Sequence, residues 1–326
     1  MLLSLHSLAA VLTFCVGSAA VAQGAAPNPA NFPSAPIRYV VPAPPGGLID
    51  TMARLVEKGV RDRLNQTVVI DNRPGAGTVL GADIVAKSPA DGQTWLAVSI
   101  SLAANSAMPG AKFDAEKTLL PVVRLAVTPM GLAVPADSPY KSFPDLLKAA
   151  KGGKVLNFGS SGNGTPSHLA LALFQGQAGV QATHVPYRGG APALVDLIAG
   201  QTDAVFVTLS EAQQHIKSGK LRLLAVINDK RVADFPNIPT SAEAGMSGLL
   251  MTGWTGIMVP QGTPQPIVQK IADSALAVAS QPEFVKRAES LGFVVAPQGP
   301  AEFNKFFKDE VGRLRVLIKE QNVRME

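Results

Sequence analysis

Pro42-Ala-Pro-Pro-Gly-Gly-Leu-Ile-Asp50 and Gly159-Ser-Ser-Gly-Asn-Gly-Thr-Pro-Ser-His168 are the two glycine-rich stretches that decide how this chain folds. Each follows a short apolar segment with the pattern of a strand, at 38–41 and 155–158, and each opens an amphipathic helix. Such a turn directs free backbone N–H groups, supported by the positive end of the helix dipole, towards whatever lies in front of the helix. Two turns of this kind facing one another predict a cradle for a small anion.

Strands and helices alternate along the whole chain. Further helices are expected at 50–64, 79–87, 142–152, 165–175, 192–199, 210–218, 264–280, 282–291 and 300–320, and further strands at 67–70, 95–100, 183–185, 204–207, 221–227, 254–259 and 293–295. This alternation predicts an α/β fold with mostly parallel sheets and helices on both faces. In such sheets ligands lie beyond the carboxyl ends of the strands, where both glycine-rich stretches would sit.

The N-terminal residues predict export. Residues 1–37 contain no Lys, Arg, Asp or Glu, and an apolar run from Leu8 to Val21 ends in Ala20-Val-Ala22, which has the small-x-small pattern of a cleavage site. We therefore expect a signal peptide over 1–22 and a tether over 23–35. Cleavage would remove Cys15, the one cysteine of the chain, so we expect no disulfide in the mature protein.

Nucleotide-binding motifs are incomplete in this sequence. Gly159–Gly164 has the spacing of a phosphate loop, but Thr165-Pro166 stands where the loop requires Lys followed by Ser or Thr. Gly75-Ala-Gly77-Thr-Val-Leu-Gly81 resembles a dinucleotide fingerprint, yet the strand that follows it ends without an acidic residue for the ribose. We expect no cofactor, and a secreted α/β enzyme that uses a dinucleotide or acts on a small carboxylate is the alternative.

The other chemistry-bearing residues are scattered. The formal net charge of +5 comes without a basic run interleaved with aromatic residues, so we expect no nucleic-acid partner. His168, His184 and His215 lack the spacing of metal ligands, and we expect no metal. Ser161 fails the nucleophile-elbow pattern because Asn163 stands where its closing glycine should be. These absences favour a receptor over an enzyme.

Seven segments, taken in order, are typical of one known family. They are Val41-Pro-Ala-Pro-Pro-Gly-Gly-Leu-Ile-Asp50, Asn72-Arg-Pro-Gly-Ala-Gly77, Ala86-Lys-Ser-Pro-Ala-Asp-Gly92, Ser161-Gly-Asn-Gly-Thr-Pro-Ser-His-Leu169, Val185-Pro-Tyr-Arg-Gly189, Asp196-Leu-Ile-Ala-Gly-Gln201 and Gly253-Trp-Thr-Gly256. On these segments the chain resembles the periplasmic substrate-binding receptors of tripartite tricarboxylate transporters, also called Bug receptors. The resemblance extends from Arg38 to the C-terminus.

The resemblance implies a two-lobed fold of the type II periplasmic-binding-protein kind, with a ligand cleft between the lobes. Lobe 1 is expected over 36–125 and 250–326, and lobe 2 over 126–249. Two crossings, at 122–134 with a break at Thr128-Pro129 and at 250–259, would act as a hinge. The expected partners are a small carboxylic acid and the membrane permease subunits of a tripartite tricarboxylate transporter, or a sensor protein. A periplasmic monomer is expected.

The resemblance also implies that the two loops hold the ligand carboxylate, through Gly46, Gly47 and Asp50 in the first stretch and Ser161, Gly164, Thr165 and Ser167, with His168 adjacent, in the second. Five further residues are expected to line the cleft and contact the ligand, namely Leu48, Tyr187, Arg188, Thr208 and Trp254. For two of them an alternative stays open, since Arg188 could be a surface charge and Trp254 could pack near the hinge. An Asp in the first turn of a helix is also favoured by the dipole alone, so Asp50 either touches ligand or only caps its helix. Family members often carry an aromatic residue, a glycine and a tyrosine where this chain has Ala43, Thr78 and Gln93. Leu48-Ile49 favour a carboxylate with a substantial hydrocarbon body.

Overall fold

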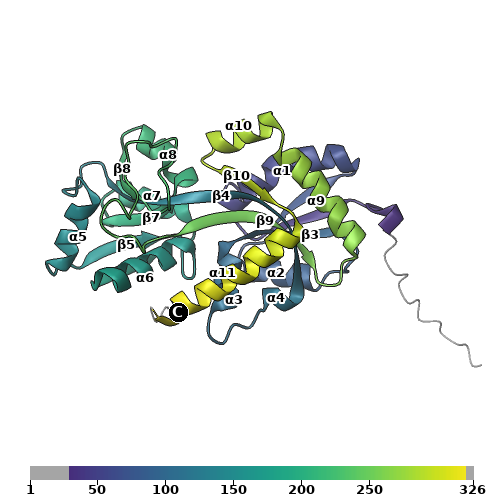
Figure 1. Ribbon diagram of the computed structural model, residues 1–326, viewed down its shortest axis with the longest axis horizontal. Coiled ribbons are helices and arrows are strands. Elements are labelled where there is room, and N and C mark those ends of the chain that lie inside the picture. Colours follow the sequence, from purple (N-terminus) through teal and green to yellow (C-terminus); the bar gives the residue numbers. More distant parts are fainter. Residues whose placement is uncertain (1–28, 321–326) are drawn as a thin grey trace, which may run out of the picture.

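The computed structural model describes residues 29–320 as two lobes lying side by side (Figure 1). The strands are β1 (Ile37–Val41), β2 (Val68–Asn72), β3 (Thr94–Ser99), β4 (Leu119–Pro135), β5 (Leu156–Ser160), β6 (Ala182–Pro186), β7 (Ala204–Thr208), β8 (Leu221–Val226), β9 (Thr252–Pro260) and β10 (Val294–Gln298). The predicted signal peptide over 1–22 and residues 23–28 of the predicted tether lie outside the described residues.

Helices alternate with these strands as the sequence predicts. They are α1 (Leu48–Leu64), α2 (Val79–Ala86), α3 (Ile100–Ala107), α4 (Ala115–Thr118), α5 (Phe143–Lys151), α6 (Pro166–Ala178), α7 (Gly190–Ile198), α8 (Leu209–Lys217), α9 (Gln265–Ala279), α10 (Pro282–Ser290) and α11 (Pro300–Glu320), with 3₁₀ turns at Pro29–Asn31 and Ala76–Thr78. The sequence does not predict α3 and α4. The helix α3 begins directly after β3, where Ser99 accepts a hydrogen bond from the backbone N–H of Ser101 and caps it.

One long strand, β4, joins the two lobes. Strands pair in the order β2-β1-β3-β9-β4-β7-β5-β6, and β8 and β10 also pair with β4. From Leu119 to Pro129, β4 pairs with β9, whereas from Met130 onward it pairs with β7 and β8. The first lobe is therefore built on β1–β3, β9, β10 and β4 up to Pro129. The second lobe is built on β5–β8 and the rest of β4.

Strand directions correct one part of the predicted fold. The α/β architecture with two lobes is confirmed, but the sheet is mixed rather than mostly parallel. Pairs among β1, β2 and β3 and among β5, β6 and β7 are parallel, while every pair that includes β4 or β9 is antiparallel. The reason is that β4 and β9 are the crossings between lobes, and a segment that returns to the first lobe runs opposite to the one that left it.

The partner switch on β4 falls at a proline. The predicted break at Thr128-Pro129 is absent, because the strand continues without interruption from Leu119 to Pro135. Pro129 is the last residue that pairs with β9, and Met130 is the first that pairs with β7. Proline has no N–H to donate to a ladder, so this position suits the point where one set of ladder bonds ends and another begins.

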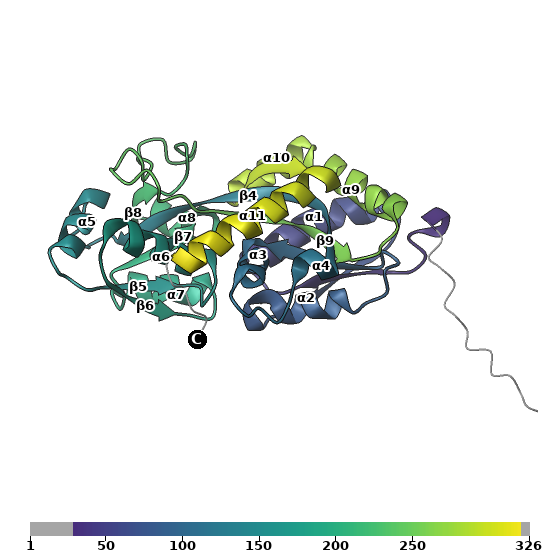
Figure 2. The ribbon, with the colours of Figure 1, turned by 60° about the horizontal axis from the view of Figure 1, so that its bottom comes forward.

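Helices cover both faces of the sheet. Along β1, Tyr39 and Val41 share an apolar cluster with α1 and α9, whereas Val40 belongs to the cluster that contains α2 and α3. Along β7, Phe206 clusters with α6, and Val205 clusters with α7. The long α11 contacts both β4 and α3 (Figure 2). Alternate residues of a strand are therefore buried against helices on opposite faces of the sheet, as in the buried strands of an α/β fold.

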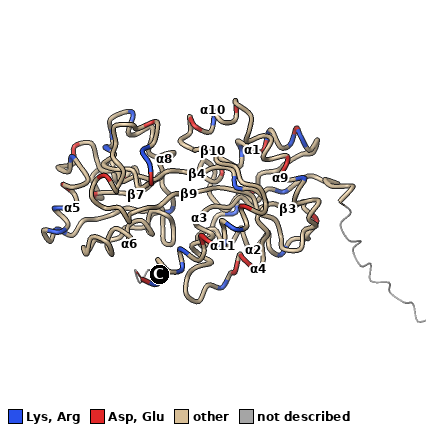
Figure 3. The backbone as a smooth tube through the Cα atoms, viewed as in Figure 1, with Lys and Arg blue, Asp and Glu red and all other residues tan. Residues whose placement is uncertain are grey.

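Charged residues occur along the backbone of both lobes (Figure 3). Within residues 29–320, no helix combines the length and the apolar character needed to cross a bilayer.

Candidate functional site

The carboxyl ends of the strands of both lobes point towards each other. Strands β1–β3 run in the same direction as β4, and β5–β7 run against it. Because β4 leads from the first lobe into the second, both sets of strands end at the boundary between them. Ser99 at the end of β3 pairs with Thr255, which pairs with Ala126, and Thr208 at the end of β7 pairs with Met130. Ala126 and Met130 are four residues apart on β4, which is about 13 Å along a strand, so the ends of β3 and β7 are separated by about that distance in the strand direction.

The first glycine-rich stretch forms the loop between β1 and α1, and Asp50 holds it. Asp50 is 1% exposed. Its Oδ2 accepts hydrogen bonds from the Gly46 N–H at 2.9 Å and the Arg54 Nε at 2.8 Å, and its Oδ1 accepts one from the Asn72 Nδ2 at 2.8 Å. The same Asn72 amide donates to the Ala43 carbonyl at 3.0 Å. Both carboxylate oxygens are thus engaged in fixing the loop.

The electrostatics of Asp50 follow from these contacts. Burial alone would raise the pKa of the Asp50 carboxyl, but hydrogen bonds from Arg54, Asn72 and Gly46, together with the charge of Arg54, lower it below its ordinary value. Gly47 precedes α1 and no side chain caps the helix there. The first-turn N–H groups of α1 are therefore left for another partner.

The second glycine-rich stretch forms the loop between β5 and α6, and hydroxyl groups hold it. The Ser167 Oγ lies 2.9 Å from both the Ser161 backbone N and the Ser161 Oγ. The Thr165 hydroxyl donates to the Gly162 carbonyl at 2.6 Å rather than capping α6, which has no side-chain cap. Gly164 donates its N–H to the Nδ1 of His168 at 3.1 Å. This loop contains no charged residue.

Two histidines stack behind the second loop. The rings of His168 and His184 lie 4.0 Å apart between centroids and are nearly parallel, at 3°. The His184 Nε2 is 2.6 Å from the Oγ of Ser160, the last residue of β5. Burial lowers the pKa of His168, and burial together with repulsion from His168 lowers the pKa of His184 to about 4. Both imidazoles are therefore neutral at pH 7.

A small cavity of about 30 Å³ lies where the helices α6, α7 and α8 begin. The side chains that line it include Ser161, Ser167, Thr208 and Glu211. The structure thus brings three of the predicted ligand-binding residues, Ser161, Ser167 and Thr208, to one point. Glu211 joins them and was not predicted.

The other predicted residues occupy different surroundings. Tyr187 is half-buried and donates its hydroxyl to the Asp196 Oδ2 at 2.7 Å, while Arg188 is exposed and Leu48 is half-buried in the first turn of α1. Trp254 is 1% exposed and packs edge-on against Phe303, Phe306 and Phe307 of α11. The structure therefore places Trp254 in the core at the crossing rather than at a surface, and its contact with ligand stays a prediction.

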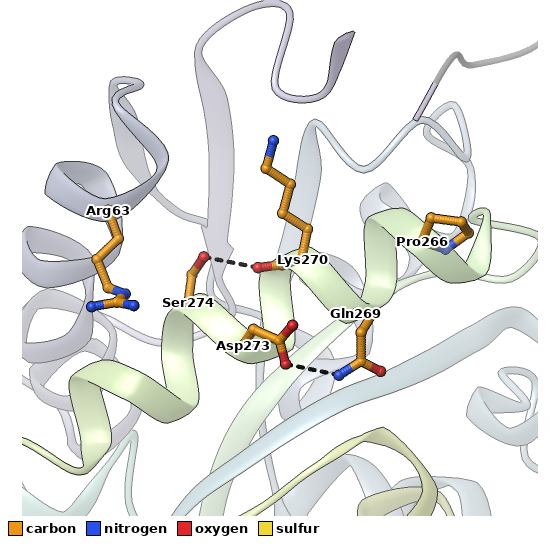
Figure 4. Close-up of a pocket in the computed structure, with 6 residues that line it drawn as sticks. All are labelled: Arg63, Pro266, Gln269, Lys270, Asp273 and Ser274. Carbon is orange, nitrogen blue, oxygen red and sulfur yellow. Dashed lines mark hydrogen bonds between the residues drawn. The ribbon is translucent and has the colours of Figure 1, made fainter. Parts of the chain in front are cut away.

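A larger hollow, of about 630 Å³, lies away from both loops (Figure 4). Its lining residues come from the end of α1 and from α9, namely Arg63, Pro266, Gln269, Lys270, Asp273 and Ser274. Arg63 is separated from the Gly47 end of α1 by 16 residues of helix, about 24 Å. Its polar groups pair locally, since the Gln269 amide donates to Asp273 and the Lys270 ammonium donates to the Phe32 carbonyl. This hollow is therefore separate from the strand ends.

Sequence reasoning missed two residues that position the first loop, since Asn72 and Arg54 fix it through Asp50. Asn105 links α3 to the 75–78 loop by donating to the Gly77 carbonyl at 2.7 Å. Within residues 29–320, no group of three or more His, Cys, Asp or Glu side chains is placed to hold a metal. The site consists of helix N-termini, hydroxyls and a few fixed charges.

Curated relatives match the chain over nearly its full length. The UPF0065 protein in the tcbD-tcbE intergenic region of Pseudomonas sp. (strain P51) is 39% identical over 293 residues, which are 89% of this chain and 87% of that protein. Protein BugT of Bordetella pertussis is 32% identical over 329 residues, covering 99% of this chain and 100% of BugT.

Solved structures are similar as well. Rpa4515 of R. palustris, solved with adipate, has a TM-score of 0.84 and 30% identity and covers 90% of this chain and 99% of its own. MatC (Rpa3494) from Rhodopseudomonas palustris, with bound malate, has a TM-score of 0.81 and 29% identity. The match covers 88% of this chain and 100% of the MatC chain. The tripartite tricarboxylate transporter family receptor model, TctC, matches residues 52–323. The chain therefore belongs to the TctC family of tripartite tricarboxylate transporter receptors, as its motifs predict.

Proposed function

We propose that this protein is a periplasmic receptor that binds a small carboxylic acid between its lobes and delivers it to the permease of a tripartite tricarboxylate transporter. The observation that carries the proposal is the meeting of strand ends at the lobe boundary. There α1 from one lobe and α6 from the other both lack a side-chain cap. Uncapped helix N-termini present N–H groups and a positive dipole, which favour a carboxylate. Malate and adipate, bound to the relatives named above, are both dicarboxylates.

The test compares each acid with its neutral counterpart. A thermal-shift screen of small carboxylic acids on the purified protein, freed of any ligand that co-purifies, should find an acid that stabilises it. At a hundred times its dissociation constant a ligand adds about 2.7 kcal/mol to the free energy of unfolding. The matching amide should give no shift because it offers no anion to the helix termini. Equal stabilisation by acid and amide would reject the carboxylate cradle.

Two variants test whether the ligand carboxylate binds at the second loop. Ser161→Ala and Thr165→Ala should reduce the shift, because both hydroxyls help to form that loop. Ser290→Ala is the matched control, since Ser290 is exposed at the end of α10 and far along the chain from either loop. An unchanged shift in both loop variants would move the site away from α6.

We further propose that β4 and β9 form the hinge and that ligand favours a closed form. A ligand that contacts loops from both lobes binds most tightly when both sets of contacts form at once. The predicted lobe bounds, 36–125 with 250–326 and 126–249, and the monomeric state belong to this proposal. Solution scattering of the stripped protein should give a smaller radius of gyration after saturation with acid. Equal radii from an open starting state would count against a hinge.

In this proposal the protein does not convert its ligand chemically. The segment 1–22 acts as a signal peptide that exports the protein. An enzyme on the same scaffold is the alternative, and product formed from a bound acid, or cofactor absorbance in the purified protein, would favour it. N-terminal sequencing of the protein from the periplasm should begin near Gln23. A start at Met1 would reject cleavage.

A further inference from the structure

Glu211 is an acidic side chain at the cavity of the second lobe, beside two of the predicted ligand-binding serines. It lies in the first turn of α8, and it lines the cavity together with Ser161 and Ser167 of the second loop. The cavity measures about 30 Å³. Since a water molecule takes up about 30 Å³ in the liquid, this space admits one small polar group and not a whole ligand.

The carboxyl of Glu211 has few partners of its own. Thr208 donates its hydroxyl to the Glu211 Oε2 at 2.7 Å, and Ser210 donates to that Thr208 hydroxyl at 3.2 Å. Within residues 29–320, no Lys, Arg or His pairs with Glu211, and Thr208 is its one hydrogen-bond donor. Burial raises the pKa of Glu211, and the Thr208 hydroxyl partly offsets this.

The first residue of α7 is fitted to this carboxyl. A Cβ on Gly190 would collide with the Glu211 Oε1 and would lie 2.6 Å from its Cδ. The φ angle of Gly190 does not require glycine, but a larger residue there would displace the end of the Glu211 side chain from its present position. The carboxyl is therefore held between the N-termini of α7 and α8, facing the second loop.

This arrangement places opposite demands on a ligand. The hydroxyls of Ser161 and Ser167 and the N-terminus of α6 favour an anion. The Glu211 carboxyl repels a second carboxylate a few ångströms away unless a donor or cation lies between them. A ligand that carries a hydrogen-bond donor beside its carboxylate meets both demands.

We infer that Glu211 is a specificity-determining residue that selects carboxylic acids bearing a hydroxyl or ammonium group next to a carboxylate. The donor group of the ligand occupies the cavity and donates to Glu211, while the carboxylate faces the second loop. This role rests on the proposed function and deepens it. It is compatible with an apolar ligand body, because Leu48 lies half-buried in the first turn of α1 in the other lobe.

Matched acids test this role. Isothermal titration of the stripped protein compares succinate with malate and aspartate, and adipate with its 2-hydroxy and 2-amino derivatives. The wild type should bind a hydroxy or amino acid at least about tenfold more tightly than the parent diacid, because hydrogen bonds to a charged group are strong. Glu211→Met, which keeps the volume but removes the acceptor, should reduce that ratio to within about twofold and should not weaken the parent diacid.

Two further variants complete the test. Glu211→Gln keeps an acceptor without the charge, so it should lose the preference for ammonium and retain part of the preference for hydroxyl. Glu283→Met is the matched control, because Glu283 also lies in the first turn of a nine-residue helix but is exposed. It should bind every acid like the wild type. A denaturation midpoint for each variant confirms that it folds.

The outcomes separate the two proposals. If a parent diacid binds as tightly as its derivatives, or if Glu211→Met leaves the ratio unchanged, the role of Glu211 is overturned and the carboxylate receptor stands. If neither these acids nor any acid in the thermal screen binds the wild type, the proposed function fails and the role of Glu211 fails with it.

Discussion

The two glycine-rich loops each precede a helix that has no side-chain cap, but different chemical groups hold them in place. The loop of the first lobe is fixed by a buried carboxylate, since Asp50 accepts from Gly46, Arg54 and Asn72. The loop of the second lobe is fixed by neutral groups, namely hydroxyl groups within the loop and the stacked imidazole rings of His168 and His184 beside it. Each solution leaves the following helix uncapped. A charged network and a neutral network can therefore each hold a loop in front of a helix N-terminus that has no side-chain cap.

Removing Asp50 should have the largest effect. Asp50→Ala leaves the Gly46 N–H and the Asn72 amide without their acceptor and breaks the ion pair with Arg54, so the free energy of unfolding should fall by about 3 kcal/mol. Denaturant titration of the stripped protein measures this loss.

The control for Asp50 lies on the same helix. Glu57 pairs with Arg61 at the same i,i+4 spacing and 3.3 Å, but the Glu57 side chain is 16% exposed, against 2% for that of Asp50. Glu57→Ala should therefore cost less than about 0.5 kcal/mol. Equal losses in the two variants would mean that the first loop does not depend on its buried carboxylate.

The two loops should also lose stability in different pH ranges. The pKa of His184 is lowered from 6.5 to about 4, so the folded state favours the neutral ring, and stability is full above pH 6.5 and lost as the pH falls towards 4. The pKa of Asp50 is lowered as well, so its contribution is lost only below about pH 4.

Unfolding free energies measured between pH 7 and pH 4.5 test this order. His184→Gln should flatten the decline, whereas His215→Gln, on α8, should leave it as in the wild type. A decline that is unchanged in His184→Gln would exclude the stacked pair as its cause.

A smaller effect on the free energy of unfolding is expected at the 75–78 loop, which follows β2. Ala76 and Thr78 have positive φ angles of 47° and 84°, and the hydroxyl of Thr78 is buried without a partner among the described groups. A β-branched residue is strained there, so Thr78→Gly should raise the free energy of unfolding by about 1 kcal/mol. The neighbouring Val79, at φ −63°, is the control. Val79→Gly should destabilise by about 1 kcal/mol or more, and a loss in both variants would contradict strain at Thr78.

Local pattern predicts most of the fold because its elements are long and periodic. The helix α1 and the strand β7 lie where apolar spacing places them. The helix α3 is missed because the apolar run of β3 continues into it, although Ser99 is a recognisable N-cap. The mixed direction of the sheet is missed because alternation of strands and helices does not reveal which strands cross between lobes.

Most of the predicted residues that the structure brings together share one segment, and Thr208, at the end of β7, is the exception. Ser161, Ser167 and Thr165 lie together in sequence, and the hydroxyl of Ser167 contacts those of the other two, while their contact with ligand stays a prediction. Asn72 reaches Asp50 from another strand, and Glu211 meets the second loop from another helix. In the sequence Glu211 is indistinguishable from the acids that commonly begin helices, because only the tertiary fold gives it a cavity.

The crossing strands also set the order in which the chain acquires its contacts. All strands of the second lobe lie within residues 119–226, whereas β3 of the first lobe must wait for β9, so that Leu96 meets Met258. A chain that emerges N-terminus first therefore completes the pairings of its second lobe while β3 still has an open edge. Contacts of such long range slow folding. The last helices close the first lobe, which delays its completion until almost the whole polypeptide is available.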